Sequence, residues 1–79
     1  MKIQINYYAL LREERGVSSE TLTTDAKTAR DLYNELQAKH KFRLGTDKLR
    51  VAINNEFSDW SRALAEGDSI MFIPPVAGG

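Results

Sequence analysis

The chain has 79 residues, enough for one domain with a modest hydrophobic core. Eleven Lys and Arg balance eleven Asp and Glu, so the sequence offers no basic field for nucleic acid or anionic lipid, and its partners are expected to be proteins or small molecules. It contains no cysteine, which excludes disulfides, thiolate nucleophiles and cysteine-based metal sites.

The first expected element is a strand over residues 2–8. Ile3, Ile5 and Tyr7 alternate with polar side chains and would share one face, with Tyr8 on the other. This alternation interrupts the apolar block that a signal peptide needs, and no apolar run approaches the roughly 20 residues of a membrane span. We therefore expect a cytoplasmic protein with no membrane partner.

Two short elements follow. Residues 9–15 are mostly helix formers and stop before Gly16, which predicts a short helix with a glycine C-cap. Residues 18–24 are rich in threonine, and Leu22 is their clearly apolar side chain. This composition is typical of an edge strand, because such a strand gains little from burial.

The strongest helical pattern runs from Thr28 to about residue 41. Its stripe follows the 3.6-residue helical period and consists of Ala29, Leu32, Tyr33, Leu36 and His40. Thr28, with Asp31 three residues later, indicates an N-terminal cap, and Glu35 is spaced to pair with Lys39. We expect this helix to cover one face of a sheet.

His40 is the single histidine and ends this stripe. It can be read as a partly buried side chain at the C-terminal end of the helix, or as a catalytic base. No cysteine, serine or acidic motif surrounds it. We therefore favour the structural interpretation.

The following connection contains Gly45, and Phe42 and Leu44 are expected to fold back onto the core. Residues 49–54 then alternate between apolar and more polar side chains, which predicts a third strand. The asparagines at 54–55 indicate a turn after it.

Phe57 is expected on a short strand or bridge. Trp60 and Leu64 lie in an irregular stretch that we expect to cover one end of the core rather than to stack on nucleic-acid bases, since basic neighbours are lacking. Residues 69–73 then read as the last strand.

These elements predict an α+β fold: a mixed sheet of four or five strands with one main helix packed on one face, and with the first and last strands parallel and central. Tyr8, Met71 and Ile73 would then lie on the uncovered face. Because an uncovered face should be polar, this apolar group predicts a protein-docking surface. The alternative is that loops cover these side chains.

The chain ends in two glycines beyond a proline stop. Pro74 cannot donate to a strand ladder, so we expect a domain over residues 1–75 and a flexible tail over residues 76–79. At about 3.3 Å per residue, this tail could reach roughly 13 Å, enough to enter a neighbouring protein's pocket. Gly78 and Gly79 could pass a narrow channel and present a carboxylate for activation as an acyl adenylate. The alternative is a frayed terminus.

The sequence contains no glycine-rich phosphate loop, no metal-ligand spacing and no paired nucleophile and histidine. We therefore expect no self-contained active site, and no nucleotide bound by this chain alone.

The closing segment resembles a known family. Residues 64–70 (LAEGDSI) and 72–79 (FIPPVAGG) are similar to the end of the small subunit of molybdopterin synthase, and residues 5–13 and 51–54 match its general pattern. The resemblance covers nearly the whole chain, and the proline pair before the terminal di-glycine is its specific part. Ser69 stands where an acidic residue is common in that family.

This resemblance implies a ubiquitin-like β-grasp fold and a sulfur-carrier cycle. An activating enzyme would use ATP to adenylate the carboxylate of Gly79, and sulfur delivery would convert it to a thiocarboxylate. The tail would then enter the large synthase subunit. There, two carriers acting in succession would supply the dithiolene sulfurs that turn cyclic pyranopterin monophosphate into molybdopterin.

On this reading the chain binds no cofactor itself and works in a heterotetramer of two small and two large subunits. Gly79 carries the sulfur, and Gly78, which has no side chain, lets the tail pass through a narrow channel. The residues expected to contact the partner are Tyr8, Met71, Ile73, Pro74, Pro75, Val76 and Ala77.

Three alternatives stay open. A thiamin-pathway sulfur carrier shares the di-glycine but is usually shorter and lacks the Pro-Pro-Val lead. A ubiquitin-like modifier would be joined to lysines of target proteins through Gly79. A passive binding domain would keep its function after loss of Gly78 and Gly79.

Overall fold

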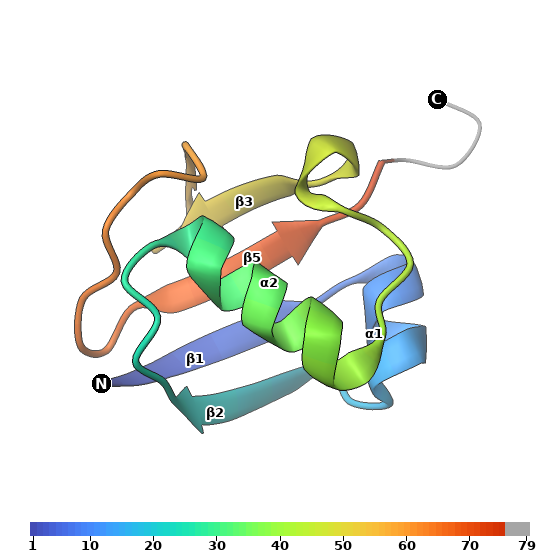
Figure 1. The fold of residues 1–79 in the computed structure, drawn as a ribbon, viewed down its shortest axis with the longest axis horizontal. Helices are drawn as coiled ribbons and strands as arrows, with labels where there is room; N and C mark the ends of the chain where they lie inside the picture. The colour runs from blue at the N-terminus through green and yellow to red at the C-terminus, as the bar shows by residue number, and fades with distance from the viewer. Residues whose placement is uncertain (76–79) are drawn as a thin grey trace.

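The first and last strands lie side by side and parallel at the centre of a mixed sheet, as predicted (Figure 1). The computed structural model describes residues 1–75 of the chain. Strand β1 (Lys2–Tyr7) pairs with β5 (Ser69–Ile73), with Ile5 opposite Ile70 and Tyr7 opposite Phe72.

Within the described residues, five strands form this sheet in the order β2-β1-β5-β3-β4. Strand β2 (Ser19–Thr23) runs antiparallel to β1 at one edge, which confirms the predicted edge strand. Strand β3 (Arg50–Ile53) runs antiparallel to β5, and the short β4 (Glu56–Ser58) forms the other edge. The chain therefore finishes its last strand in the middle of the sheet.

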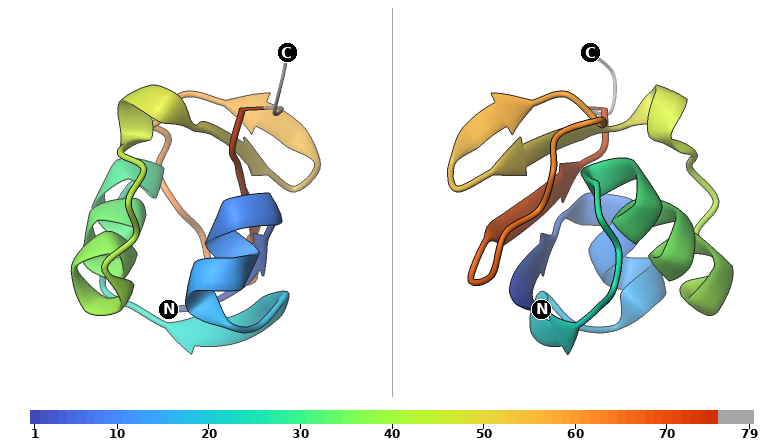
Figure 2. Two further views of the ribbon diagram at one scale, coloured as in Figure 1. Left: turned by 90° about the vertical axis from the view of Figure 1, so that its right-hand side faces the viewer. Right: turned by 60° about the vertical axis from the view of Figure 1, so that its left-hand side comes forward.

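Helix α2 (Ala29–His40) packs across one face of the sheet (Figure 2). Its predicted cap is confirmed, because the Thr28 hydroxyl accepts a hydrogen bond from the Asp31 backbone N–H at 3.2 Å. The expected pairing of Glu35 with Lys39 is wrong: among the described residues, Glu35 instead accepts a hydrogen bond from the Thr24 hydroxyl at 2.7 Å. Thr24 is buried, so its hydroxyl requires such a partner.

The core lies between α2 and the sheet and is rich in aromatic side chains. Tyr33 meets Phe72 edge-on at 5.0 Å between ring centroids, and Trp60 stacks on Phe72 at 6.0 Å. Phe42 folds back and is buried, and Leu64 closes one end, both as predicted. Large rings fill much of the volume that a short chain must bury.

Helix α1 (Ala9–Arg15) ends as predicted at Gly16, whose φ of 88° is the left-handed conformation that glycine favours. The sequence did not predict the 3-10 helix η1 (Thr46–Lys48) between α2 and β3. None of the helices within residues 1–75 is long and apolar enough to cross a membrane.

A charged cluster joins β1, α1 and β2. The carboxylate of Glu20 accepts hydrogen bonds from the hydroxyl of Tyr7 and from Arg15, whose Nη2 lies 2.8 Å away. These donors, Arg15 first, lower the pKa of Glu20 to about 2. Burial, with the nearby carboxylate, raises the pKa of Tyr7 above its ordinary range. These hydrogen bonds connect the end of α1 to strands β1 and β2.

Candidate functional site

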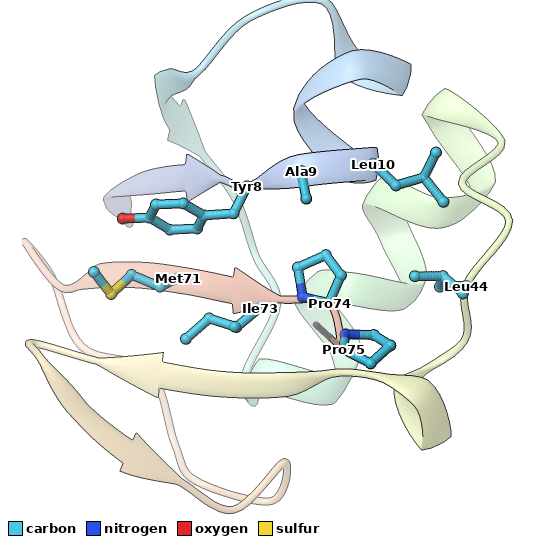
Figure 3. Close-up of a pocket in the computed structure, with 8 residues that line it drawn as sticks. All are labelled: Tyr8, Ala9, Leu10, Leu44, Met71, Ile73, Pro74 and Pro75. Atoms are coloured by element: carbon cyan, nitrogen blue, oxygen red, sulfur yellow. The ribbon is translucent and has the colours of Figure 1, made fainter. Parts of the chain in front are cut away.

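An apolar hollow lies at the C-terminal end of β5, between this strand and the start of α1 (Figure 3). Its volume is about 700 Å³. We call it the apolar groove, and it is lined by Tyr8, Ala9, Leu10, Leu44, Met71, Ile73, Pro74 and Pro75. Tyr8, Met71 and Ile73 therefore lie together, as the alternation of the strands predicted, while partner binding by these residues stays a prediction.

Exposure shows that loops do not cover this surface within the described residues. The Tyr8 side chain is exposed, Met71 and Ile73 are half-buried, and Pro75 is exposed. Pro74 is buried and offers little area for contact. The alternative, in which loops bury these apolar side chains, is therefore wrong for the described residues.

One wall of the groove forms where β1 passes into α1. Tyr8 is extended, with φ −130° and ψ 149°, and Ala9 then turns into the left-handed region at φ 50°. This abrupt change places Tyr8, Ala9 and Leu10 along one wall. A left-handed conformation is unfavourable for a residue with a Cβ, so the turn stores strain at the groove.

The connection after α2 also contributes to the groove, through Leu44. The hydroxyl of Tyr33 donates to the carbonyl oxygen of Leu44 at 2.6 Å, and the side-chain amide of Gln37 donates to the same oxygen at 3.1 Å. Gln37 also donates to the carbonyl of Phe42 at 3.2 Å. Two helix side chains thus fix the connection that carries Leu44. The sequence pattern identified none of these three hydrogen bonds, because all of them depend on tertiary packing.

A second hollow of about 560 Å³ lies on the other side of the strand end. Its lining residues are Asp47, Lys48, Leu49, Arg50, Phe57, Ile73, Pro74 and Pro75. Residues 73–75 line both hollows and form a ridge between them. The side chain of Phe57 is 60% exposed, and the guanidinium carbon of Arg50 lies 3.8 Å from its ring centre.

The predicted tail residues Val76, Ala77, Gly78 and Gly79 lie outside the described residues. The structure places their point of departure: they follow Pro75, which is exposed and lies on the ridge between the two hollows.

His40 and the acidic side chains are the remaining candidates for site chemistry in the described part of the chain. Residues 1–75 contain no group of three His, Cys, Asp or Glu side chains that could hold a metal ion. His40 is partly buried at the end of α2, with its ring 5.6 Å from that of Phe42, and it lines neither hollow. Burial lowers the pKa of His40. This is the structural role that the sequence favoured.

Comparisons with known proteins agree with this architecture. Residues 5–79 match the ThiS family. The molybdopterin synthase sulfur carrier subunit of Haemophilus influenzae is 36% identical over 80 residues, which cover 98% of this chain and 99% of that protein.

Solved structures also resemble the chain. Small archaeal modifier protein 1 of Haloferax volcanii superposes with a TM-score of 0.79 at 25% identity, over 95% of this chain and 98% of that one. The complex of subunits 1 and 2 of the molybdopterin-converting factor from Helicobacter pylori gives a TM-score of 0.71 at 22% identity over all of both chains, a likeness of fold. The predicted ubiquitin-like β-grasp fold is confirmed.

Proposed function

This chain belongs to the ThiS family, and on that basis we propose that it is the sulfur carrier subunit of a molybdopterin synthase. The full-length similarity to a subunit of that name favours this assignment over a thiamin-pathway carrier. Its partners are then a large synthase subunit, in a heterotetramer of two small and two large subunits, and an activating enzyme.

The observation that carries the proposal is the open apolar groove at the base of the tail. A carrier must hold its terminus in the active site of another protein while a bond forms there. Tyr8, Met71 and Ile73 offer that partner an apolar surface next to the residue from which the tail departs. Docking at this place makes the entry of the tail an intramolecular event.

The chemistry uses the terminal carboxylate, because the chain has no cysteine to carry a persulfide. The activating enzyme binds ATP and joins AMP to Gly79, with release of pyrophosphate. A hydrosulfide ion from the sulfur donor then attacks the acyl carbon, and AMP leaves with the electron pair of the broken C–O bond, which yields the thiocarboxylate. This chain binds no cofactor. The large subunit supplies the pterin pocket and the acid and base groups for transfer to cyclic pyranopterin monophosphate.

A reconstituted synthase assay tests this function through the terminus. Deleting Gly79, or adding one alanine after it, is expected to abolish sulfur transfer and to leave the thermal melting temperature unchanged, because the buried core side chains all lie within residues 3–72. One alanine added before Met1 serves as the matched control and should retain activity. Sulfur transfer by the chain that lacks Gly79 would contradict the proposal.

A ubiquitin-like modifier is the second candidate, because a protein named as an archaeal modifier shares this fold. A modifier would form isopeptide bonds from Gly79 to lysines of other proteins. The two functions differ in their product, since a carrier releases its sulfur and returns to a free carboxylate. Lysine-linked adducts in cell extracts, together with an inactive synthase assay, would favour the modifier.

A further inference from the structure

The second hollow holds a cation whose orientation is fixed. The guanidinium of Arg50 stacks on the ring of Phe57 at 3.8 Å, and stacking of this kind restrains the guanidinium plane. Within residues 1–75, Arg50 takes part in neither of the ion pairs and in none of the side-chain hydrogen bonds. With respect to that part of the chain, its N–H donors are therefore available for a ligand.

A carboxylate matches these donors best. The rim of a guanidinium presents parallel N–H groups that bind both oxygens of a carboxylate, and a restrained guanidinium loses less entropy when it does so. Lys48 adds a second positive charge to the hollow. Asp47 is the one acidic residue that lines this hollow. Its Oδ1 lies close to Gly45, 3.0 Å from the position that a Cβ would take there, and so lies beside the connection between α2 and β3.

The hollow also offers apolar contact. Phe57 is the most exposed large apolar side chain of the described residues, with 60% of its surface accessible, and Leu49 and Pro75 lie in the same hollow. A ligand that fits must combine a carboxylate with a neighbouring apolar group, as an Asp or Glu beside an apolar residue on a protein surface does.

The position of Arg50 links this hollow to the tail. Arg50 pairs with Ile73 across β3 and β5, and residues 73–75 line both the second hollow and the apolar groove. A protein that fills the groove is therefore in contact with the ridge next to Arg50. A second contact beyond the ridge would hold the partner on both sides of the point where the tail leaves.

We propose that the second hollow is the charged half of the docking surface, in which Arg50 binds an Asp or Glu side chain of the large subunit and Phe57 packs against that residue's apolar neighbour. This inference rests on the proposed function, which supplies the partner. It extends the surface from the apolar groove across residues 73–75 to β3 and β4.

Calorimetric titration tests this assignment, with the molybdopterin synthase large subunit of the same organism as the probe. Arg50→Glu is expected to weaken binding by about tenfold or more, because it sets two carboxylates against each other. Arg50→Lys should weaken it by a few-fold, since lysine keeps the charge but not the paired donors, and Phe57→Ala by about tenfold. Binding by the Arg50→Glu chain should also depend less on salt.

The matched control is Lys39→Glu, which makes the same charge change at an exposed position of α2 on the other face of the sheet. It should bind within about twofold of the native chain. Arg50 and Phe57 are both exposed, so their variants should melt close to the native temperature.

Three outcomes would overturn the inference. If Arg50→Glu and Phe57→Ala bind normally while Met71→Asp in the apolar groove does not, the charged half is wrong and the proposed function stands. If the native chain does not bind the large subunit at all, both fail. If sedimentation shows a dimer of the free chain that Arg50→Glu dissociates, the hollow instead receives a second copy.

Discussion

Ala9 has a backbone conformation that suits glycine better than alanine. Its φ of 50° lies in the left-handed region, where a Cβ costs roughly 1–2 kcal/mol. The strain coincides with the wall of the apolar groove, because the same turn presents Tyr8 and Leu10 to it. Strained residues often persist where surrounding structure and function require them.

Ala9→Gly is expected to leave the free energy of unfolding unchanged or to raise it by up to about 1 kcal/mol, because glycine relieves the strain. Ala38→Gly is the matched control, at an exposed position inside α2, and should lower that free energy by about 1 kcal/mol. Urea unfolding of both variants measures the difference. Equal losses would mean that Ala9 is not strained.

Glu20 links stability to pH. Its pKa is about 2 in the folded chain and 4.5 as an ordinary carboxyl, because Arg15 and Tyr7 donate hydrogen bonds to the ionised form. A lowered folded pKa contributes stability that is fully present above pH 4.5. That contribution disappears as the pH falls from 4.5 towards about 2.

Glu20→Gln is therefore expected to lower the free energy of unfolding by about 1–3 kcal/mol at pH 7, and by progressively less below pH 4.5, until the two chains converge near pH 2. Denaturant melts across that range measure the difference. Glu13→Gln, at an exposed site on α1, is the control and should follow the native pH profile. A constant deficit for Glu20→Gln at every pH would contradict the assigned cause.

At the scale of elements, β5 provides both core and surface. Ile70 and Phe72 point under α2 and are fully buried, whereas Met71 and Ile73 alternate onto the other face and line the apolar groove. The two-residue period of a strand therefore separates the side chains that stabilise the fold from those proposed to contact the partner.

Met71→Asp is expected to weaken binding of the large subunit by more than about tenfold, with a loss of less than about 1 kcal/mol in the free energy of unfolding. Ser69→Asp is the matched control, because Ser69 lies on the same face of the same strand but does not line the groove. It should bind normally. Titration and thermal melts together decide the point, and a large loss of stability in Met71→Asp would place Met71 in the core instead.

The sequence predicted those elements whose pattern is local. The apolar period of α2, its Thr28 cap and the alternation of β1 and β5 all follow from neighbouring residues, and the grouping of Tyr8 with Met71 and Ile73 followed from the parallel pairing. These features form because the packed face of each element is encoded in its own residues.

The rest of the candidate site depends on contacts between distant segments. The second hollow joins η1, β3, β4 and the strand end, and the wall that carries Leu44 is held by hydrogen bonds from Tyr33 and Gln37. No periodic pattern marks such contacts. The predicted pairing of Glu35 with Lys39 was wrong for the same reason, since the Glu35 carboxylate instead accepts a hydrogen bond from the buried Thr24 hydroxyl.

At the scale of the whole molecule, the fold delivers the tail from the middle of the sheet. Strand β5 lies between β1 and β3, so the exit point has protein surface on both sides: the apolar groove towards α1 and the second hollow towards β4. Helix α2 covers the opposite face and keeps the core closed (Figure 2). A partner that covers both hollows would fix the position and direction of the tail at once.

Mass spectrometry of the intact chain tests the central claim, that Gly79 carries the sulfur. The chain is incubated with the activating enzyme, ATP and a sulfur donor, and is then treated with a thiol alkylating reagent. Exchange of oxygen for sulfur adds about 16 Da, as does oxidation of methionine, so the alkylation is what distinguishes them. Since the chain has no cysteine, a single alkyl group reports a thiocarboxylate.

We predict one alkyl group per chain, located on the C-terminal peptide, dependent on ATP and absent when Gly79 is deleted. An unalkylated chain after full incubation would contradict the account, and so would alkylation that persists without ATP or without Gly79.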